Sequence, residues 1–187
     1  MKRILLFVFC ALAVTSLHAQ EEEVPDKKFD PNNLFFGGSL GLSFGTYTLV
    51  NVTPQVGYRF NRYLAAGAGI NFIYSSAHYQ NYIPEYREEY GVVGLNIFGR
   101  VFPIQYIFLQ LQPEVNYTWG NLKFYDGTEE QKLKGKFIPS LLGGLGGMIP
   151  TGARGGFFIM AQYDLLQETR NPYGPNVFFN FGYVFGM

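Results

Sequence analysis

Cysteine, charge and long apolar runs are all scarce in this chain of 187 residues. Its single cysteine, Cys10, lies near the N-terminus, so we expect neither disulfides nor thiol chemistry in the rest of the chain. Charged residues make up 15% of the sequence, whereas soluble domains carry roughly 25%. Beyond the N-terminus no apolar run reaches about 18 residues, which excludes a helical membrane protein. The low charge therefore needs another explanation.

Glycine and aromatic residues are abundant instead. The chain contains 23 glycines, 19 phenylalanines and 14 tyrosines, and 48% of its residues are hydrophobic. So many aromatic residues exclude disorder, and the glycines lack the regular period of collagen. The length leaves room for one domain of about 150 residues, which argues against a multidomain enzyme.

The N-terminus has the pattern of a secretory signal peptide spanning residues 1–19. Lys2 and Arg3 precede an apolar stretch, residues 4–14, and a short polar segment then ends at Ala19. A membrane anchor is the alternative, but this stretch is too short to cross a hydrocarbon core of about 30 Å. We therefore expect Sec-type export and cleavage after Ala19.

Residues 20–33 are charged and contain proline, with almost nothing to bury, so we expect a flexible periplasmic lead-in. Removing Lys2 and Arg3 changes the balance of 14 basic and 14 acidic residues to 12 and 14, a net charge of about minus two. That balance gives no strong attraction to nucleic acid, and we expect no nucleic-acid partner.

From Leu34 onward, apolar residues recur with a period of two, which is the pattern of β-strands. The pattern recurs eight times, at about residues 36–44, 50–60, 64–75, 93–101, 107–119, 137–149, 157–165 and 179–187. Pro54, Pro113 and Pro139 fall inside these segments. We expect β-bulges or misplaced strand boundaries there, because proline lacks a donor for the ladder.

The connections between these strands alternate in length. Short turns are expected at residues 61–62, 103–105 and 150–154, and long polar loops at residues 77–90, 121–136 and 167–176, with the first hairpin near residues 45–49 as the exception. This alternation is typical of an antiparallel meander, and eight strands of about ten residues close into a barrel. The sequence therefore predicts an all-β, eight-stranded antiparallel up-and-down barrel over residues 34–187.

The distribution of charge favours a transmembrane barrel over a soluble secreted one. Lysines beyond the lead-in occur only at positions 123, 132, 134 and 136, in the longest predicted loop. Inside the predicted strands the charged residues are Arg59, Arg100, Glu114 and Asp164, all on the face rich in Gly, Ser, Asn and Gln. The opposite face is apolar and uncharged, as lipid requires, with aromatic girdles predicted at both interfaces. The girdle residues are Phe44, Tyr74, Trp119 and Tyr163 towards the loops, and Phe60, Tyr183 and Phe185 towards the turns.

By its signal peptide, strand count, loop asymmetry and terminal strand, the segment 34–187 resembles the small eight-stranded outer-membrane barrels represented by OmpX and the membrane domain of OmpA. The resemblance implies a monomer in the cell outer membrane, surrounded by lipid and lipopolysaccharide. It also implies that the barrel-assembly machinery reads the last strand. The alternating residues of that strand are Phe179, Phe181, Tyr183, Phe185 and Met187, where the family more commonly ends in phenylalanine.

Catalytic and metal-binding patterns are weak in this sequence. Lipid-modifying barrels of the same compartment rely on histidine, and the mature chain has only His78, with Ser76 on the same strand face and no acidic residue at an identifying spacing. The acidic residues of the predicted loops lack calcium-loop spacing, and the glycines at 143–147 lack the lysine and helix of a phosphate loop. We expect no cofactor, no metal site and no enzymatic activity.

The four charged residues on the polar face form a predicted polar network in the lumen. Arg59 and Arg100 either pair with Glu114 and Asp164 or line a polar pathway. Side chains fill the interior of an eight-stranded barrel, so we expect a plugged lumen. The expected role is structural or adhesive, through long extracellular loops that contact an unidentified ligand. A narrow pore for small solutes is the alternative, and a lipid-modifying enzyme is a third hypothesis.

Overall fold

The computed structural model describes residues 29–44, 47–79, 83, 85–125, 131–152 and 154–186. The predicted signal peptide, residues 20–28 of the predicted lead-in and Met187 lie outside these described residues. A single turn of 3-10 helix, Pro31–Asn33, comes before the first strand in the chain. Within the described ranges, no helix is long and apolar enough to span a membrane.

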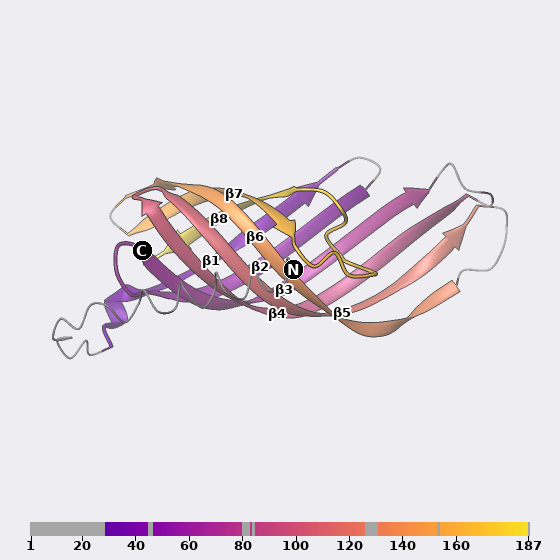
Figure 1. The fold of residues 1–187 in the computed structure, drawn as a ribbon, viewed down its shortest axis with the longest axis horizontal. Helices are drawn as coiled ribbons and strands as arrows, with labels where there is room; N and C mark the ends of the chain where they lie inside the picture. The colour runs from indigo at the N-terminus through magenta and orange to yellow at the C-terminus, as the bar shows by residue number, and fades with distance from the viewer. Residues whose placement is uncertain are drawn as a thin grey trace, which may run out of the picture. The chain divides into compact units, whose positions relative to one another are not determined.

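Eight strands form one closed barrel in chain order, each antiparallel to its neighbours, and β1 pairs with β8 to close it (Figure 1). The strands are β1 (Leu34–Ser43), β2 (Tyr47–Arg59), β3 (Leu64–Tyr79), β4 (Tyr86–Ile104), β5 (Ile107–Phe124), β6 (Gln131–Pro150), β7 (Gly155–Asp164) and β8 (Phe178–Phe185). The predicted all-β, up-and-down architecture is confirmed. We call the end with the β2–β3, β4–β5 and β6–β7 connections the turn end, and the opposite end the loop end.

The inner and outer faces of the barrel wall differ in polarity. Side chains on the outer face are apolar and exposed, for example Leu95 at 67%, Ile97 at 62% and Val115 at 55%. Asn96 and Asn116, the next residues on the same strands, point inward and are 4% and 0% exposed. A soluble barrel has the reverse arrangement, because water selects polar side chains for the outside. The barrel is therefore a transmembrane one, with lipid as the solvent of its outer face.

Strands β3 to β6 extend further than the sequence predicted. β4 begins at Tyr86, and β6 begins at Gln131. The predicted long loops at residues 77–90 and 121–136 are mostly strand, so this part of the prediction is wrong. The prediction of lysine-free strands is wrong with it, because β5 and β6 carry Lys123, Lys132, Lys134 and Lys136. Of the three predicted long loops, the one between β7 and β8 is irregular throughout in the described part of the chain, as predicted.

The added strand segments form a four-stranded sheet at the loop end, where β3 to β6 reach beyond the other strands (Figure 1). We call this sheet the extension and define it as residues 77–79, 86–89, 121–124 and 131–136. Cross-strand pairs stabilise it: the rings of Tyr79 and Tyr86 stack at 4.8 Å, and Lys123 Nζ lies 2.9 Å from Glu89 Oε2. Such cross-strand pairs stabilise a ladder between polar strands. The polar composition of these segments predicted loops because it does not show which residues pair across strands.

The strand prolines lie where the ladder is interrupted or has no partner. Pairing of β2 with β3 breaks at Pro54 and resumes in the same register, and pairing of β4 with β5 does the same opposite Pro113. Pro139 lies beyond the last pair that joins β6 to β7. The bulges predicted at these three prolines are therefore wrong, and so is the alternative of a misplaced boundary, because all three lie inside strands. The register shifts lie instead between Val101 and Ile104 and between Thr118 and Gly120.

Residues 131–140 of β6 have no β7 strand partner and so present an open edge, contacted at Lys134 O by Arg170 Nη1 at 3.0 Å. The next residue, Leu141, points its N–H and C=O groups to the β7 side, where Asp164 Oδ1 accepts at 3.0 Å and Leu165 N donates at 2.8 Å. Pro139, two residues earlier, therefore faces the same open side. Proline and lysine are residues that prevent an exposed edge from pairing with another chain. Their presence here protects the edge.

Removing this protection is expected to cause self-association. In the variant with Lys134→Thr, Lys136→Thr and Pro139→Val, the open edge becomes a template for a second chain, so dimers or larger species form in detergent. Chemical cross-linking and size-exclusion chromatography measure the effect. Lys123→Thr, in a strand paired on both sides, is the control and is expected to remain as monomeric as the unaltered chain. Equal association of the two variants would contradict edge protection.

Candidate functional site in the barrel interior

Buried polar side chains from seven strands meet inside the barrel, and we call them the polar layer. They hydrogen-bond to one another, as Asn96 Nδ2 does to Asn71 Oδ1 at 2.6 Å. Buried polar groups need partners, and the layer supplies many of them internally. Four of its buried atoms have no hydrogen-bond partner among the described residues: Gln55 Nε2, Asn96 Oδ1, Arg100 Nη1 and Asn180 Oδ1. The members are Asn51, Thr53, Gln55, Asn71, Asn96, Arg100, Gln110, Gln112, Glu114, Asn116, Ser140, Gln162 and Asn180.

Two glutamine amides connect the arginine and the glutamate of the polar layer. Arg100 Nε donates to Gln110 Oε1 at 2.6 Å. Gln110 Nε2 donates to Gln112 Oε1, and Gln112 Nε2 donates to Glu114 Oε1 at 2.6 Å. Every second residue of a strand points the same way, so β5 lines up these three side chains on its inner face. We call this chain of hydrogen bonds the amide relay; each amide accepts on the arginine side and donates on the glutamate side, which favours both charges.

Direct pairing of the four predicted network residues does not occur, and this expectation is corrected. Register explains why Arg100 and Glu114 do not pair. Arg100 lies opposite Gln110, which is four residues before Glu114 along β5. Asp164 accepts hydrogen bonds from two backbone N–H groups, and Arg59 donates to two backbone carbonyls of the following turn. Within the described part of the chain, no ion pair joins any two of the four residues.

Phenylalanine rings fill the interior on the turn side of the polar layer. Four of them lie directly opposite a glycine of the neighbouring strand: Phe35 opposite Gly57, Phe98 opposite Gly67, Phe108 opposite Gly146 and Phe158 opposite Gly182. A Cβ at any of these glycines would overlap the facing ring, so glycine is what admits the ring into the lumen. Together with buried Phe102, these four rings form what we call the aromatic floor. Arg100 Cζ lies 4.8, 5.1 and 5.0 Å from three of their centroids, within cation–π range.

The β7–β8 loop, residues 165–177, lies on the other side of the polar layer and places Tyr173 in the interior (Figure 1). Tyr173 is 1% exposed, its hydroxyl donates to Glu114 Oε2 at 2.6 Å, and its ring stacks on Phe178 at 4.8 Å. Sequence reasoning missed Tyr173, because alternation describes strands and does not report which loop residue enters a lumen. Tyr173 packs in a loop-side cluster with Leu49, Ile73, Val92, Leu142 and Phe178.

Apart from Met187, which lies outside the described residues, the residues predicted to form girdles and the assembly signal are accessible on the outside of the barrel. Phe44, Tyr74, Trp119, Phe60 and Phe185 are exposed, and Tyr163 and Tyr183 are partly exposed. Phe179 and Phe181 of the last strand are also exposed. Contact with a lipid interface and recognition of the last strand during assembly stay predictions.

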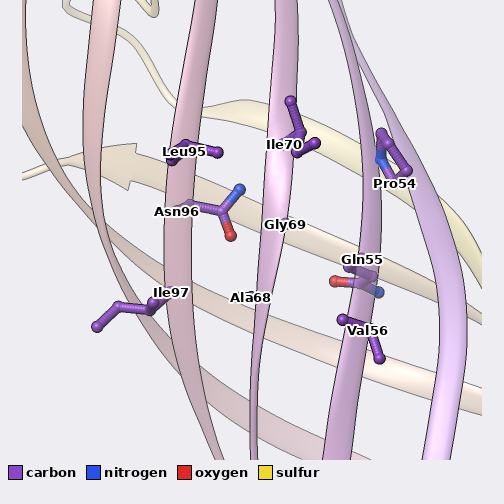
Figure 2. Close-up of a pocket in the computed structure, with 9 residues that line it drawn as sticks. All are labelled: Pro54, Gln55, Val56, Ala68, Gly69, Ile70, Leu95, Asn96 and Ile97. Atoms are coloured by element: carbon purple, nitrogen blue, oxygen red, sulfur yellow. The ribbon is translucent and has the colours of Figure 1, made fainter.

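The outer face is hollowed between β2, β3 and β4, around the small side chain of Ala68. The hollow has a volume of about 460 Å³ and is lined by Pro54, Gln55, Val56, Ala68, Gly69, Ile70, Leu95, Asn96 and Ile97 (Figure 2). Gln55 and Asn96 are buried members of the polar layer, so the accessible lining is aliphatic. A surface of this kind accommodates lipid chains and offers no group for catalysis.

His78 has a carboxylate partner that sequence reasoning missed. Its Nε2 lies 2.7 Å from Glu85 Oε1, and the ring of Tyr125 lies 5.2 Å from the imidazole. The contact exists because β3 and β4 continue into the extension and bring the two ends of their hairpin together. Among the described residues, no group of three or more side chains is placed to hold a metal ion.

Comparison with known proteins yields similarity of architecture only. No family model matches the chain, and no curated protein matches it. The solved structure of the de novo designed TMB2.3 is 13% identical, with a TM-score of 0.39, over 82% of this chain and 92% of that one. The translocator domain of autotransporter NalP from Neisseria meningitidis is 10% identical, with a TM-score of 0.42, over 86% and 90%. The N-terminal β-barrel domain of Pseudomonas aeruginosa OprF is 12% identical, with a TM-score of 0.37, over 82% and 96%.

Proposed function

We propose that the chain is an integral outer-membrane barrel of the OmpX and OmpA membrane-domain kind, without catalytic activity, and with a structural or adhesive role at the cell surface. The observation that carries this proposal is the polarity of the wall, which is apolar outside and polar inside. The predicted signal peptide supports export by the Sec route. Because β1 begins and β8 ends at the turn end, we place that end in the periplasm and the extension outside the cell.

We further propose that side chains close the lumen against solutes. The aromatic floor on one side and the loop-side cluster on the other support this, since both consist of buried apolar side chains packed across the interior. Purified protein in planar bilayers is expected to show no steady conductance. A solute-permeable conductance that persists in Glu114→Gln would overturn the closed lumen and favour the narrow-pore alternative.

The extension supplies the surface for the adhesive role. It carries aromatic and charged side chains of both signs well beyond the apolar belt, including Tyr86 and the pair formed by Lys123 and Glu89. Tyr125, which directly follows the extension, is 56% exposed. Aromatic residues among charged ones are typical of protein contact surfaces. The ligand is an unidentified extracellular one.

Shortening the extension is expected to abolish adhesion while the barrel stays intact. Replacing residues 79–86 by an Asn-Gly turn joins His78 to Arg87, which already face each other across the hairpin. Attachment of expressing cells to surfaces is expected to fall to the level of cells without the protein. Heat-dependent migration on a detergent gel checks the barrel, and Arg62→Ser at the turn end is the control. Undiminished attachment of the shortened variant, with its barrel folded, would contradict the adhesive role.

A further inference from the structure

The β7–β8 loop contacts the barrel interior through a very small part of its length. Residues 165–169 and 175–177 are exposed, whereas Pro172 and Tyr173 are buried. The loop makes its own internal hydrogen bonds: Asn171 Oδ1 accepts from Tyr173 N at 2.9 Å, and Asn171 Nδ2 donates to Gly174 O at 3.2 Å. Towards the neighbouring strands, Gln167 Nε2 donates to Asp164 O at 2.8 Å and Arg170 Nη1 donates to Lys134 O at 3.0 Å. The contact of the loop with the polar layer is made by the Tyr173 hydroxyl, which donates to Glu114 Oε2 at 2.6 Å.

Two residues of the loop have an unfavourable backbone conformation. Gln167 and Arg170 have φ values of 50° and 67°, in the left-handed region that residues with a Cβ seldom occupy. Such conformations persist only where surrounding contacts hold them. The interior, in contrast, does not depend on the loop for its polar contacts, since Glu114 also accepts from Gln112 at 2.6 Å and from Asn116 at 2.9 Å.

We propose that the β7–β8 loop is a releasable lid over the polar layer, latched by the Tyr173 hydroxyl on Glu114. This inference rests on the closed lumen proposed above, because the buried rings of the aromatic floor close the turn side of the polar layer, so that release of the lid opens the layer towards the loop end. Release of the lid exposes the carboxylate and amide groups of the polar layer to small hydrophilic molecules from outside. It does not create a pore, because the floor stays in place.

Thiol accessibility tests the latch directly, since the chain has a single cysteine that is readily removed. In a Cys10→Ser background, Ser140→Cys places one thiol in the polar layer, where Ser140 is 2% exposed and lies 3.5 Å from Asn116 Nδ2. A small cationic methanethiosulfonate reagent is the probe. With Tyr173 present, the thiol is expected to react far more slowly than in the unfolded chain.

Tyr173→Phe keeps the ring but removes the hydroxyl, and it is expected to raise the reaction rate at least about tenfold, the factor for a lost hydrogen bond to a charged group. Tyr173→Ala is expected to raise it further. Tyr163→Phe on the outer face is the matched control. In Met148→Cys the thiol lies on the turn side, and its reaction rate is expected to be the same with and without the Tyr173 substitutions.

The latch would be overturned if the thiol of Ser140→Cys reacted at the same rate in both Tyr173 variants as with Tyr173 present. It would also be overturned if, with Tyr173 present, that thiol already reacted as fast as in the unfolded chain. Heat-dependent migration on a detergent gel checks that each variant has folded. If Tyr173→Ala does not fold, Tyr173→Phe alone tests the latch. Bilayer conductance of the unaltered chain is a separate measurement that tests the closed lumen. Failure of the latch is thereby distinguished from failure of the proposed function.

Discussion

Leu111→Arg is expected to lower the free energy of unfolding in lipid by about 2 to 4 kcal/mol, the cost of a cation at the middle of the outer face of a membrane barrel. Leu111 lies on the outer face of β5 and is 52% exposed. Its cross-strand neighbours are Gly99 and Gly143, so a longer side chain meets no steric obstacle. The loss therefore reports on the solvent that surrounds the wall. Urea unfolding in phospholipid vesicles, followed by the fluorescence of the single tryptophan, Trp119, measures it.

Asn121→Arg is the matched control for this experiment. Position 121 lies on the same strand and alternates onto the same face, but it belongs to the extension, where the surroundings are aqueous. The substitution is expected to change the unfolding free energy by no more than about 0.5 kcal/mol. A soluble barrel predicts small effects at both positions. Two small effects would therefore contradict the membrane assignment, whereas a large effect at Leu111 alone supports it.

The faces of the strands were predictable because side-chain direction follows directly from the two-residue period. Alternation placed Glu114 and Asn116 on one face and Val115 on the other, the distribution of charge assigned the first face to the inside, and the structure has them so. The same period carries no information on where a strand ends. Polar residues continue a ladder as readily as apolar ones when water surrounds them, so the strand segments of the extension were predicted as loops.

The contacts that build the interior depend on register, which the sequence does not state. Phe108 faces Gly146 because of one particular alignment of β5 with β6, and a shift by one residue would place a different side chain against the ring. The amide relay has the same origin, since Arg100 reaches Gln110 only in the observed alignment of β4 with β5. Sequence reasoning identified the two buried charges but not the side chains between them.

Breaking the arginine end of the amide relay is expected to have the largest effect in the interior. Arg100→Met removes the guanidinium, leaves Gln110 Oε1 and Gln55 Oε1 without their donor, and leaves the Glu114 carboxylate without a counter-charge. Removing one partner of a buried charge pair costs about 3 to 5 kcal/mol in unfolding free energy. Urea titration of folded protein in vesicles measures the loss. A loss below about 1 kcal/mol would contradict the stabilising role of the relay.

The relay also predicts how the two charges are coupled. Glu114→Gln removes the other charge, and the double variant is expected to be more stable than the sum of the single losses, by about 0.5 to 3 kcal/mol of coupling. Gln112→Leu interrupts the chain of amides between the charges without changing either of them. If the amides transmit the interaction, the coupling measured in the Gln112→Leu background falls towards zero. If it stays at its full value, the two charges interact directly through the interior and the glutamines serve only to fill space.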